Sequence, residues 1–206
     1  MTMNKETSHC KRWVACALFL TVSGVLVPLS SAQEVPVFQI TPVESTIKFG
    51  VKASVPIEGS FDQWKASLTF TSPDVTTAVF DVEIQAASVD TGSSLKNNKL
   101  KSSDFFDVDN NPLITFKSTK VVQTGPDTFE LDGNFTIRGV TKAEKLALTV
   151  SGRGTGTGQI NGTMAFDRKD YGMNSGIPFI KIANRVEVTV SLKATRVAGP
   201  PVVFKQ

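Results

Sequence analysis

The densest group of residues able to do acid–base chemistry is the segment Asp167-Arg168-Lys169-Asp170-Tyr171. Its two carboxylates, with two cations between them and a phenol beside them, could act as general acid and base. The same group could instead hold a loop together, because charges at a strand end satisfy one another. These residues leave open both a hydrolase or isomerase that uses Asp167, Asp170 and Tyr171 and a structural cluster.

Two other patterns resemble ligand-binding loops. Asp107, Asp109 and Asn111 have the spacing that opens a calcium loop, but proline follows where the loop needs glycine, and serine stands where it needs the final glutamate. The glycine-rich segment 152–158 resembles a phosphate-binding loop, but no helical pattern follows it. We therefore predict no metal and no phosphate site at these positions.

The N-terminal segment has the three parts of a secretory signal peptide. Lys11 and Arg12 precede the apolar residues 13–27, and small residues end at Ala32. The apolar run has 15 residues, fewer than the roughly 20 that a membrane-spanning helix needs. We predict cleavage near Ala32 and a periplasmic or secreted protein.

Both cysteines and the single histidine lie in this predicted signal peptide. The mature chain would then have no disulfide, no Cys or His nucleophile, no histidine-assisted serine triad, and no zinc or copper site of the usual kind. Cleavage would remove three basic residues and one acidic residue from totals of 22 and 19, which leaves 19 and 18. This near-neutral balance argues against nucleic-acid binding, which needs a clustered basic face.

The elements that must position these residues are β-strands. Apolar and polar residues alternate with a period of two, as in half-buried strands. Short polar links between them predict hairpins. We predict an all-β domain at residues 33–198, an eight-stranded antiparallel barrel rather than a sandwich because closure removes exposed edges, with a flexible tail at 199–206. The eight segments are residues 45–51, 61–70, 78–86, 113–123, 129–137, 146–150, 160–166 and 186–192.

One stretch, residues 99–116, departs from the strand pattern. The polar segment 93–101, which overlaps the start of this stretch, predicts a short surface helix between the third and fourth strands. Phe105 and Phe106 then stand among aspartates, ahead of an Asn-Asn-Pro turn. These aromatic side chains could form a lid over an apolar cavity, or could plug one end of an ordinary core.

Several ordered blocks resemble the YceI family. They are GSF at residues 59–61 with Trp64, VDTG at 89–92, LKSSDFFD at 100–107, GNFTIRGVT at 133–141 and DRKDYGM at 167–173. The resemblance implies a lipocalin-like barrel that binds a polyisoprenoid or another long-chain amphiphile and is often dimeric. Independently, the chain has 14 phenylalanines, and phenylalanine suits a dry cavity because it has no polar group to satisfy.

Two departures from the family lie where a ligand head group would be selected. Lys96 and Lys99 stand where the family usually has arginine and histidine before Leu100, and Ala53 stands at a usual histidine position. Polar groups at a pocket mouth determine head-group preference. We therefore carry over the apolar chain of the family's ligand but not its head group.

The resulting prediction is a non-catalytic carrier or scavenger without a cofactor, which sequesters one isoprenoid, quinone or fatty-acyl molecule. Its partners would be this ligand, a membrane or donor protein contacted transiently, and a second copy in a homodimer. The alternatives are the hydrolase or isomerase above and a ligand-free adaptor that docks through a sheet edge. The predicted binding residues are Phe49, Phe70, Phe80, Ile84, Phe116, Phe135, Met164 and Phe166 along the tail of the ligand, Trp64, Phe105 and Phe106 at the mouth, Lys96, Lys99, Arg138 and Arg168 for the head, and Leu100.

Overall fold

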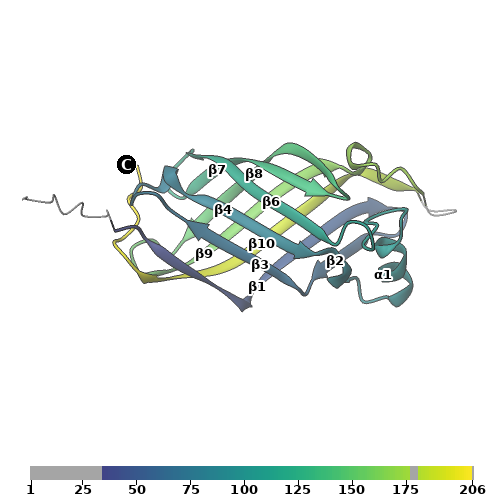
Figure 1. The fold of residues 1–206 in the computed structure, drawn as a ribbon, viewed down its shortest axis with the longest axis horizontal. Helices are drawn as coiled ribbons and strands as arrows, with labels where there is room; N and C mark the ends of the chain where they lie inside the picture. Colours follow the sequence, from purple (N-terminus) through teal and green to yellow (C-terminus); the bar gives the residue numbers. More distant parts are fainter. Residues whose placement is uncertain (1–33, 177–180, 206) are drawn as a thin grey trace, which may run out of the picture. The chain divides into compact units, whose positions relative to one another are not determined.

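The computed structural model describes residues 34–176 and 181–205. The predicted signal peptide and its cleavage site lie outside these residues. The domain within Gln33–Gln206 consists of one curled antiparallel sheet and a short helix (Figure 1). The strands are β1 Val37–Ala53, β2 Ile57–Phe61, β3 Trp64–Thr69, β4 Val79–Gln85, β5 Val89–Asp90, β6 Leu113–Gln123, β7 Thr128–Ile137, β8 Val140–Ser151, β9 Thr157–Asp167 and β10 Ile182–Ala198.

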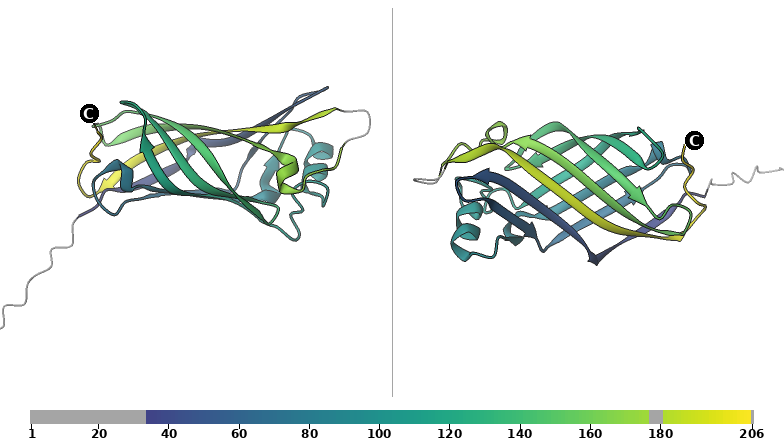
Figure 2. Two further views of the ribbon diagram at one scale, coloured as in Figure 1. Left: turned by 90° about the horizontal axis from the view of Figure 1, so that it is seen from above. Right: turned by 180° about the vertical axis from the view of Figure 1, so that it is seen from behind.

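The strands are hydrogen-bonded in the order β3-β4-β6-β7-β8-β9-β10-β1-β2-β5, so most neighbours in the sheet are also neighbours in sequence. The sheet curls until β3 lies against β1 (Figures 1 and 2). Over the described residues no backbone ladder joins these two strands. Side chains close the seam, and the rings of Phe38 and Phe70 lie 5.8 Å apart between centroids.

The predicted all-β antiparallel fold is confirmed, but the strand count differs. The eight predicted strands correspond to β1, β3, β4 and β6 to β10. The strands β2 and β5 have five and two residues, too few for alternation to stand out from a loop. They pair with each other at one end of the sheet.

Alternation along each long strand places the apolar residues inside. Ile47 and Phe49 of β1 are buried, as are Phe80, Val82 and Ile84 of β4. The intervening side chains are more exposed. A period of two is therefore enough to fix which face of each strand forms the core.

The two ends of the barrel are closed differently (Figure 2). At one end, here called the lid end, lie α1 (Ser94–Lys101), residues 102–112, and a 3₁₀ turn at Arg168–Tyr171. The helix is polar and buries only Leu100. In the described part of the chain no helix is both long and apolar enough to span a membrane.

At the opposite end, the C-terminal segment predicted to be a flexible tail lies against the barrel. The backbone N–H of Val203 donates to the carbonyl of Pro73 at 2.8 Å, and the N–H of Val75 donates to the carbonyl of Val203 at 3.0 Å. The Phe204 ring lies 6.1 Å from that of Phe129. Two prolines keep the segment extended, which leaves its other backbone groups free to pair with a neighbouring segment.

Candidate functional site

The candidate site is an apolar cavity beneath the lid end. The centre of a water molecule could move through about 70 Å³ of it. Such a cavity is narrow, so an extended chain suits it better than a bulky ring system. Apart from Arg168, its walls are made of aliphatic, phenylalanine and methionine side chains.

Half of the predicted binding residues line this cavity. Phe49, Ile84, Phe135 and Phe166 project from β1, β4, β7 and β9. Leu100, Phe105 and Phe106 come from α1 and the segment after it, and Arg168 comes from the 3₁₀ turn. Lining residues absent from the prediction include Val51, Ile57, Ile137, Met173 and Val186. Their strand parity could have identified Val51, Ile137 and Val186.

The segment of residues 102–112, here called the lid, carries two aromatic side chains that pack into the barrel as well as covering it. Phe105 and Phe106 are buried. The ring of Phe106 lies 6.0 Å from that of Phe61 and 6.4 Å from that of Phe49 between centroids. Both interpretations of this stretch therefore hold in part, because the rings belong to the core and also form one wall of the cavity.

The other predicted residues lie away from this cavity. Phe80 and Phe116 are buried deeper in the barrel, with ring centroids 6.4 Å apart. Met164 is buried on β9, and Phe70 lies at the opposite end of the barrel. Trp64 is half-buried at the start of β3 and does not line the cavity.

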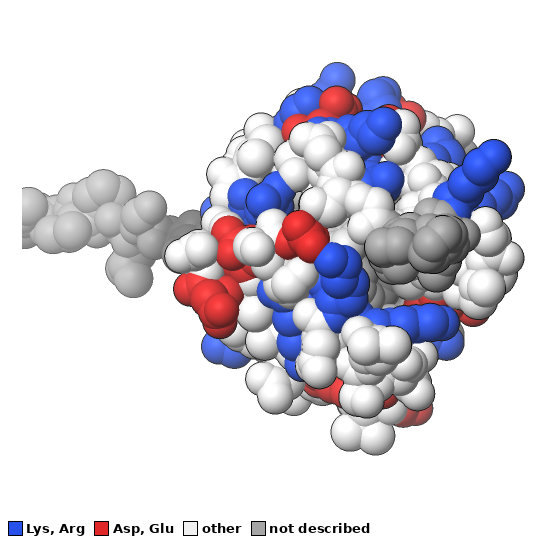
Figure 3. Space-filling model, turned by 90° about the vertical axis from the view of Figure 1, so that its right-hand side faces the viewer, with Lys and Arg blue, Asp and Glu red and all other residues white. Residues whose placement is uncertain are grey.

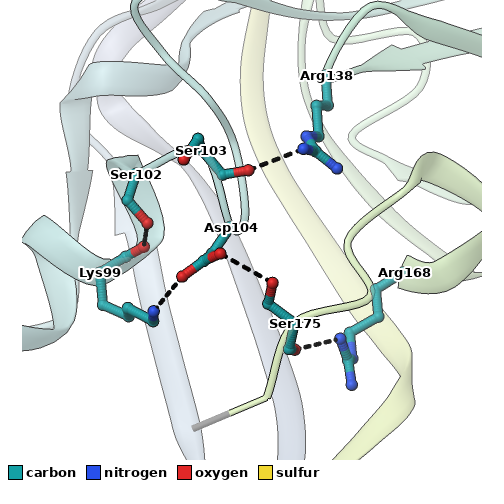
Figure 4. Close-up of polar contacts among 7 residues, drawn as sticks. All are labelled: Lys99, Ser102, Ser103, Asp104, Arg138, Arg168 and Ser175. Atoms are coloured by element: carbon teal, nitrogen blue, oxygen red, sulfur yellow. Dashed lines mark hydrogen bonds and ion pairs between the residues drawn. The ribbon is translucent and has the colours of Figure 1, made fainter.

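Asp104 connects the lid to two other segments (Figure 4). Its carboxylate pairs with Lys99 of α1, and its Oδ1 accepts a hydrogen bond from Ser175 Oγ at 2.9 Å. The hydrogen bond from Lys99 is the main reason that the pKa of Asp104 is lowered, and the bond from Ser175 adds to it. Because Lys99 is engaged in this way, it holds the lid rather than lining the cavity.

Arg138 forms the second connection of the lid. It occupies a two-residue turn between β7 and β8 with Gly139, and φ is positive at both residues, 53° and 72°, as in a type I′ turn. Its guanidinium donates to the carbonyl of Ser103 at 2.8 Å and to the carbonyl of Gly172. The turn thus places Arg138 between the lid and the segment after β9 (Figure 4).

Arg168 is the predicted head-group cation that reaches the cavity. It is buried, and its guanidinium donates to the carbonyls of Ala183 at 3.2 Å, Ser175 at 3.0 Å and Met173. Among the described residues, no carboxylate lies within ion-pair distance of it. Neither Lys96 nor Arg138 lines the cavity.

The charged surface of the lid end is mixed. Lysine and arginine side chains are spread across it, with acidic side chains between them (Figure 3). Charge selection in the cavity would therefore depend on a local group such as Arg168 rather than on a uniform surface potential.

The candidate acid–base cluster is engaged in structural contacts. Asp167 caps the 3₁₀ turn by accepting from the Lys169 N–H at 2.8 Å, and Asp170 lies 3.3 Å from Lys142 Nζ. The Tyr171 hydroxyl donates to Glu144 Oε1 at 2.8 Å. Burial, followed by this bond to a carboxylate, raises the pKa of Tyr171.

The residues with calcium-loop spacing make local contacts instead. Asp107 accepts hydrogen bonds from the side-chain amides of Asn110 at 3.0 Å and Asn111 at 3.1 Å. Within residues 34–176 and 181–205, no three His, Cys, Asp or Glu side chains gather as a metal site would require.

Comparison with known proteins identifies similar chains. A family model described as a YceI-like domain matches residues 38–194. A UPF0312 protein of Azotobacter vinelandii is 28% identical over 143 residues, which are 67% of this chain and 73% of that protein. A UPF0312 protein of Pseudomonas aeruginosa PAO1 is 29% identical with the same coverage.

Two solved structures share the fold. Burkholderia cenocepacia BcnA superposes with a TM-score of 0.69 and 24% identity, covering 76% of this chain and all of that one. A polyisoprenoid binding domain from Saccharophagus degradans, described as implicated in plant cell wall breakdown, has a TM-score of 0.63 and 15% identity, covering 78% and 99%. At these identities the likeness concerns the fold.

Proposed function

The chain belongs to the YceI-like domain family, and on this basis we propose that it binds a long-chain amphiphile in the cavity beneath the lid. The ligand would be an isoprenoid, a quinone or a fatty-acyl compound, sequestered or carried without chemical change. The protein would act in the periplasm or outside the cell after signal-peptide cleavage. Transient contact with a membrane or donor protein and a homodimer are parts of the same proposal.

The observation that carries the proposal is the apolar wall of the cavity. Burial of each methylene group contributes about 0.8 kcal/mol, so a chain of about ten carbons gains enough to offset much of the cost of association. The polyisoprenoid binding domain with the same fold lends support. The acid–base cluster gives little support to catalysis, because Asp167, Asp170 and Tyr171 are already engaged in the contacts described above.

Arg168 favours an anionic head group. The hydrogen-bond partners of its buried guanidinium are backbone carbonyls, which carry no net charge. A buried charge without a counter-ion is costly. A carboxylate or phosphate at the cavity mouth would supply the missing charge through strong charge-assisted hydrogen bonds.

The experiment is native mass spectrometry of the exported protein, followed by organic extraction and identification of the released compound. We expect a stoichiometric long-chain adduct. A bare protein mass, together with no binding of added fatty acids, isoprenols or quinones, would contradict the proposal.

A matched pair of variants locates the site. Val51 lines the lid-end cavity and Val150 lines a cavity at the opposite end, and both are half-buried strand residues. We expect Val51→Trp to fill the first cavity and abolish the adduct, whereas Val150→Trp retains it. Circular dichroism would verify that both variants fold, since overpacking costs about 1–3 kcal/mol. Loss of the adduct in Val150→Trp alone would assign the ligand to the opposite end.

A further inference from the structure

The barrel interior contains two separate cavities. The first lies beneath the lid, and the second lies at the opposite end, beneath the C-terminal segment that includes Val202 and Phe204. The centre of a water molecule could move through about 130 Å³ of the second cavity. No described residue lines both cavities.

A solid layer of side chains separates the two cavities. The strand residues that face inward between them are buried, yet they line neither cavity. Phe80 is 2% exposed, Leu131 is 2% exposed and Leu192 is 0% exposed. The dividing layer includes Phe80, Phe116, Leu131, Leu146, Val190 and Leu192.

Two glycines make the dividing layer close-packed. A Cβ atom at Gly133 would lie 2.5 Å from Cζ of Phe116, so the Phe116 ring fills the space that a side chain there would take. A Cβ atom at Gly162 would lie 2.9 Å from Cγ2 of Val190. Large side chains therefore fill the space beside these two glycines, which have no side chain of their own, as in a fully packed core.

We infer that the cavity beneath the lid is blind-ended and that the dividing layer sets an upper limit on the length of the ligand chain. This inference rests on the proposed function and specifies its ligand class. The cavity wall extends from Ile47 to Val51 on β1 and from Ile182 to Val188 on β10. At about 3.3 Å per residue and a strand tilt of about 40°, these runs give a depth of roughly 10–15 Å.

This depth corresponds to a medium-length chain. With carbon–carbon bonds of about 1.5 Å, an extended alkyl chain advances about 1.25 Å per carbon, so roughly 8–12 carbons fit. Longer chains would leave their remaining carbons outside the mouth, in water. The cavity therefore buries about 8–12 carbons of the ligand chain, and the additional length of a long polyprenyl chain contributes nothing to affinity.

The test is a series of linear carboxylates from hexanoate to octadecanoate, each titrated into delipidated full-length mature protein by calorimetry below its micelle concentration. We expect affinity to rise about fourfold per methylene group, and then to level off within about twofold beyond roughly 8–12 carbons. An affinity that continues to rise through octadecanoate would overturn the length limit. Failure of every carboxylate, and also of added isoprenols and quinones, to bind would instead overturn the proposed function.

A matched pair of variants tests the role of the dividing layer. Phe116 belongs to the layer, whereas Phe129 is buried beside Phe204 at the opposite end. We expect Phe116→Leu to move the point at which affinity levels off to longer chains, and Phe129→Leu to leave it unchanged. Equal behaviour of the two variants would show that the layer does not set the limit. If Phe116→Leu does not fold, Val190→Ala opens the same layer with a smaller change.

Discussion

Tyr171 should remain protonated far above the pH at which tyrosine ordinarily ionises. Its side chain is fully buried, its ring lies 5.2 Å from that of Phe166, and its hydroxyl donates to Glu144. Burial and the adjacent carboxylate both disfavour the phenolate, so the pKa is raised above its ordinary value of 10.0. A phenol held in this form cannot act as a general base near neutral pH.

The raised pKa makes stability depend on pH in a definite direction. The folded state keeps the proton that the unfolded state releases, so the stabilisation is fully present below the unfolded value of 10.0 and is lost progressively above it. The expected slope is about 1.4 kcal/mol per pH unit. Tyr171→Phe removes this contribution, so the slope should be shallower by that amount in the variant.

The variant also loses a hydrogen bond to a charged acceptor. Such a bond contributes about 1.5–3 kcal/mol, and a domain of this size loses about 2–4 °C of Tm per kcal/mol. Tyr171→Phe should therefore unfold roughly 3–12 °C lower at neutral pH, because the ring packing is retained and only the hydroxyl is lost.

The assay is direct because the chain has a single tyrosine. Phenolate absorbance and far-ultraviolet circular dichroism are followed together as the pH is raised. We expect the phenolate band to appear only when the dichroism signal of the folded sheet is lost. A phenolate band with a midpoint near pH 10, while the dichroism is unchanged, would refute the reasoning.

Three further predictions concern the packing, the lid and the opposite end. Gly133→Ala should lower the free energy of unfolding by about 1–3 kcal/mol in denaturant titrations, because its methyl group would meet the Phe116 ring; a neutral outcome would contradict the close packing. The pKa of Asp104 is lowered, chiefly by its hydrogen bond from Lys99, so its contacts persist above the usual value near 3.8 and are lost as the pH falls below it. Release of a bound chain in stopped-flow displacement should therefore be constant from about pH 5 to about pH 8 and faster below about pH 4, and Asp104→Asn should remove that acid dependence. Phe204→Ala should cost about 1–2 kcal/mol, because it removes one aromatic pair and one cation–π contact; thermal unfolding equal to the wild type would show that the C-terminal segment adds nothing.

The fold could be predicted from sequence because one face of each long strand is buried. Alternation at Ile47, Phe49 and Val51 fixes the inward set of β1, and the same rule holds for β4 and β7. The rule fails where a strand is too short to show a period, as at Val89–Asp90. The short helix at Ser94–Lys101 was recognisable because its polar residues interrupt this alternation.

The cavity was only half predictable because strand parity says which residues face inward but not how deep they lie. Phe49 and Phe116 satisfy the same parity rule, yet Phe49 lines the cavity and Phe116 belongs to the dividing layer. The difference depends on neighbours such as Gly133, which are distant in sequence and adjacent only after strand pairing. An alternating pattern carries no information on that depth.

The polar contacts of the lid were not predictable, because they join segments far apart in the chain. Asp104 and Ser175 are separated by 71 positions, and Arg138 reaches a carbonyl 35 positions away. All three lie in or beside turns, whose geometry decides the direction of a side chain. The sequence therefore indicated cations at the mouth, but it did not indicate that Lys99 and Arg138 form hydrogen bonds with lid residues.

The magnitudes of these contacts show what holds the lid in place. The side chains of Lys99 and Asp104 are 36% and 43% exposed, and an ion pair exposed to this degree is weak because water screens its charges. Burial of Phe105 or Phe106 contributes about 1.5–3 kcal/mol each. The polar contacts therefore select which segments meet, whereas the phenylalanine rings supply most of the stability. Because those same rings form one wall of the cavity, opening the lid and exposing the proposed chain-binding surface are a single event.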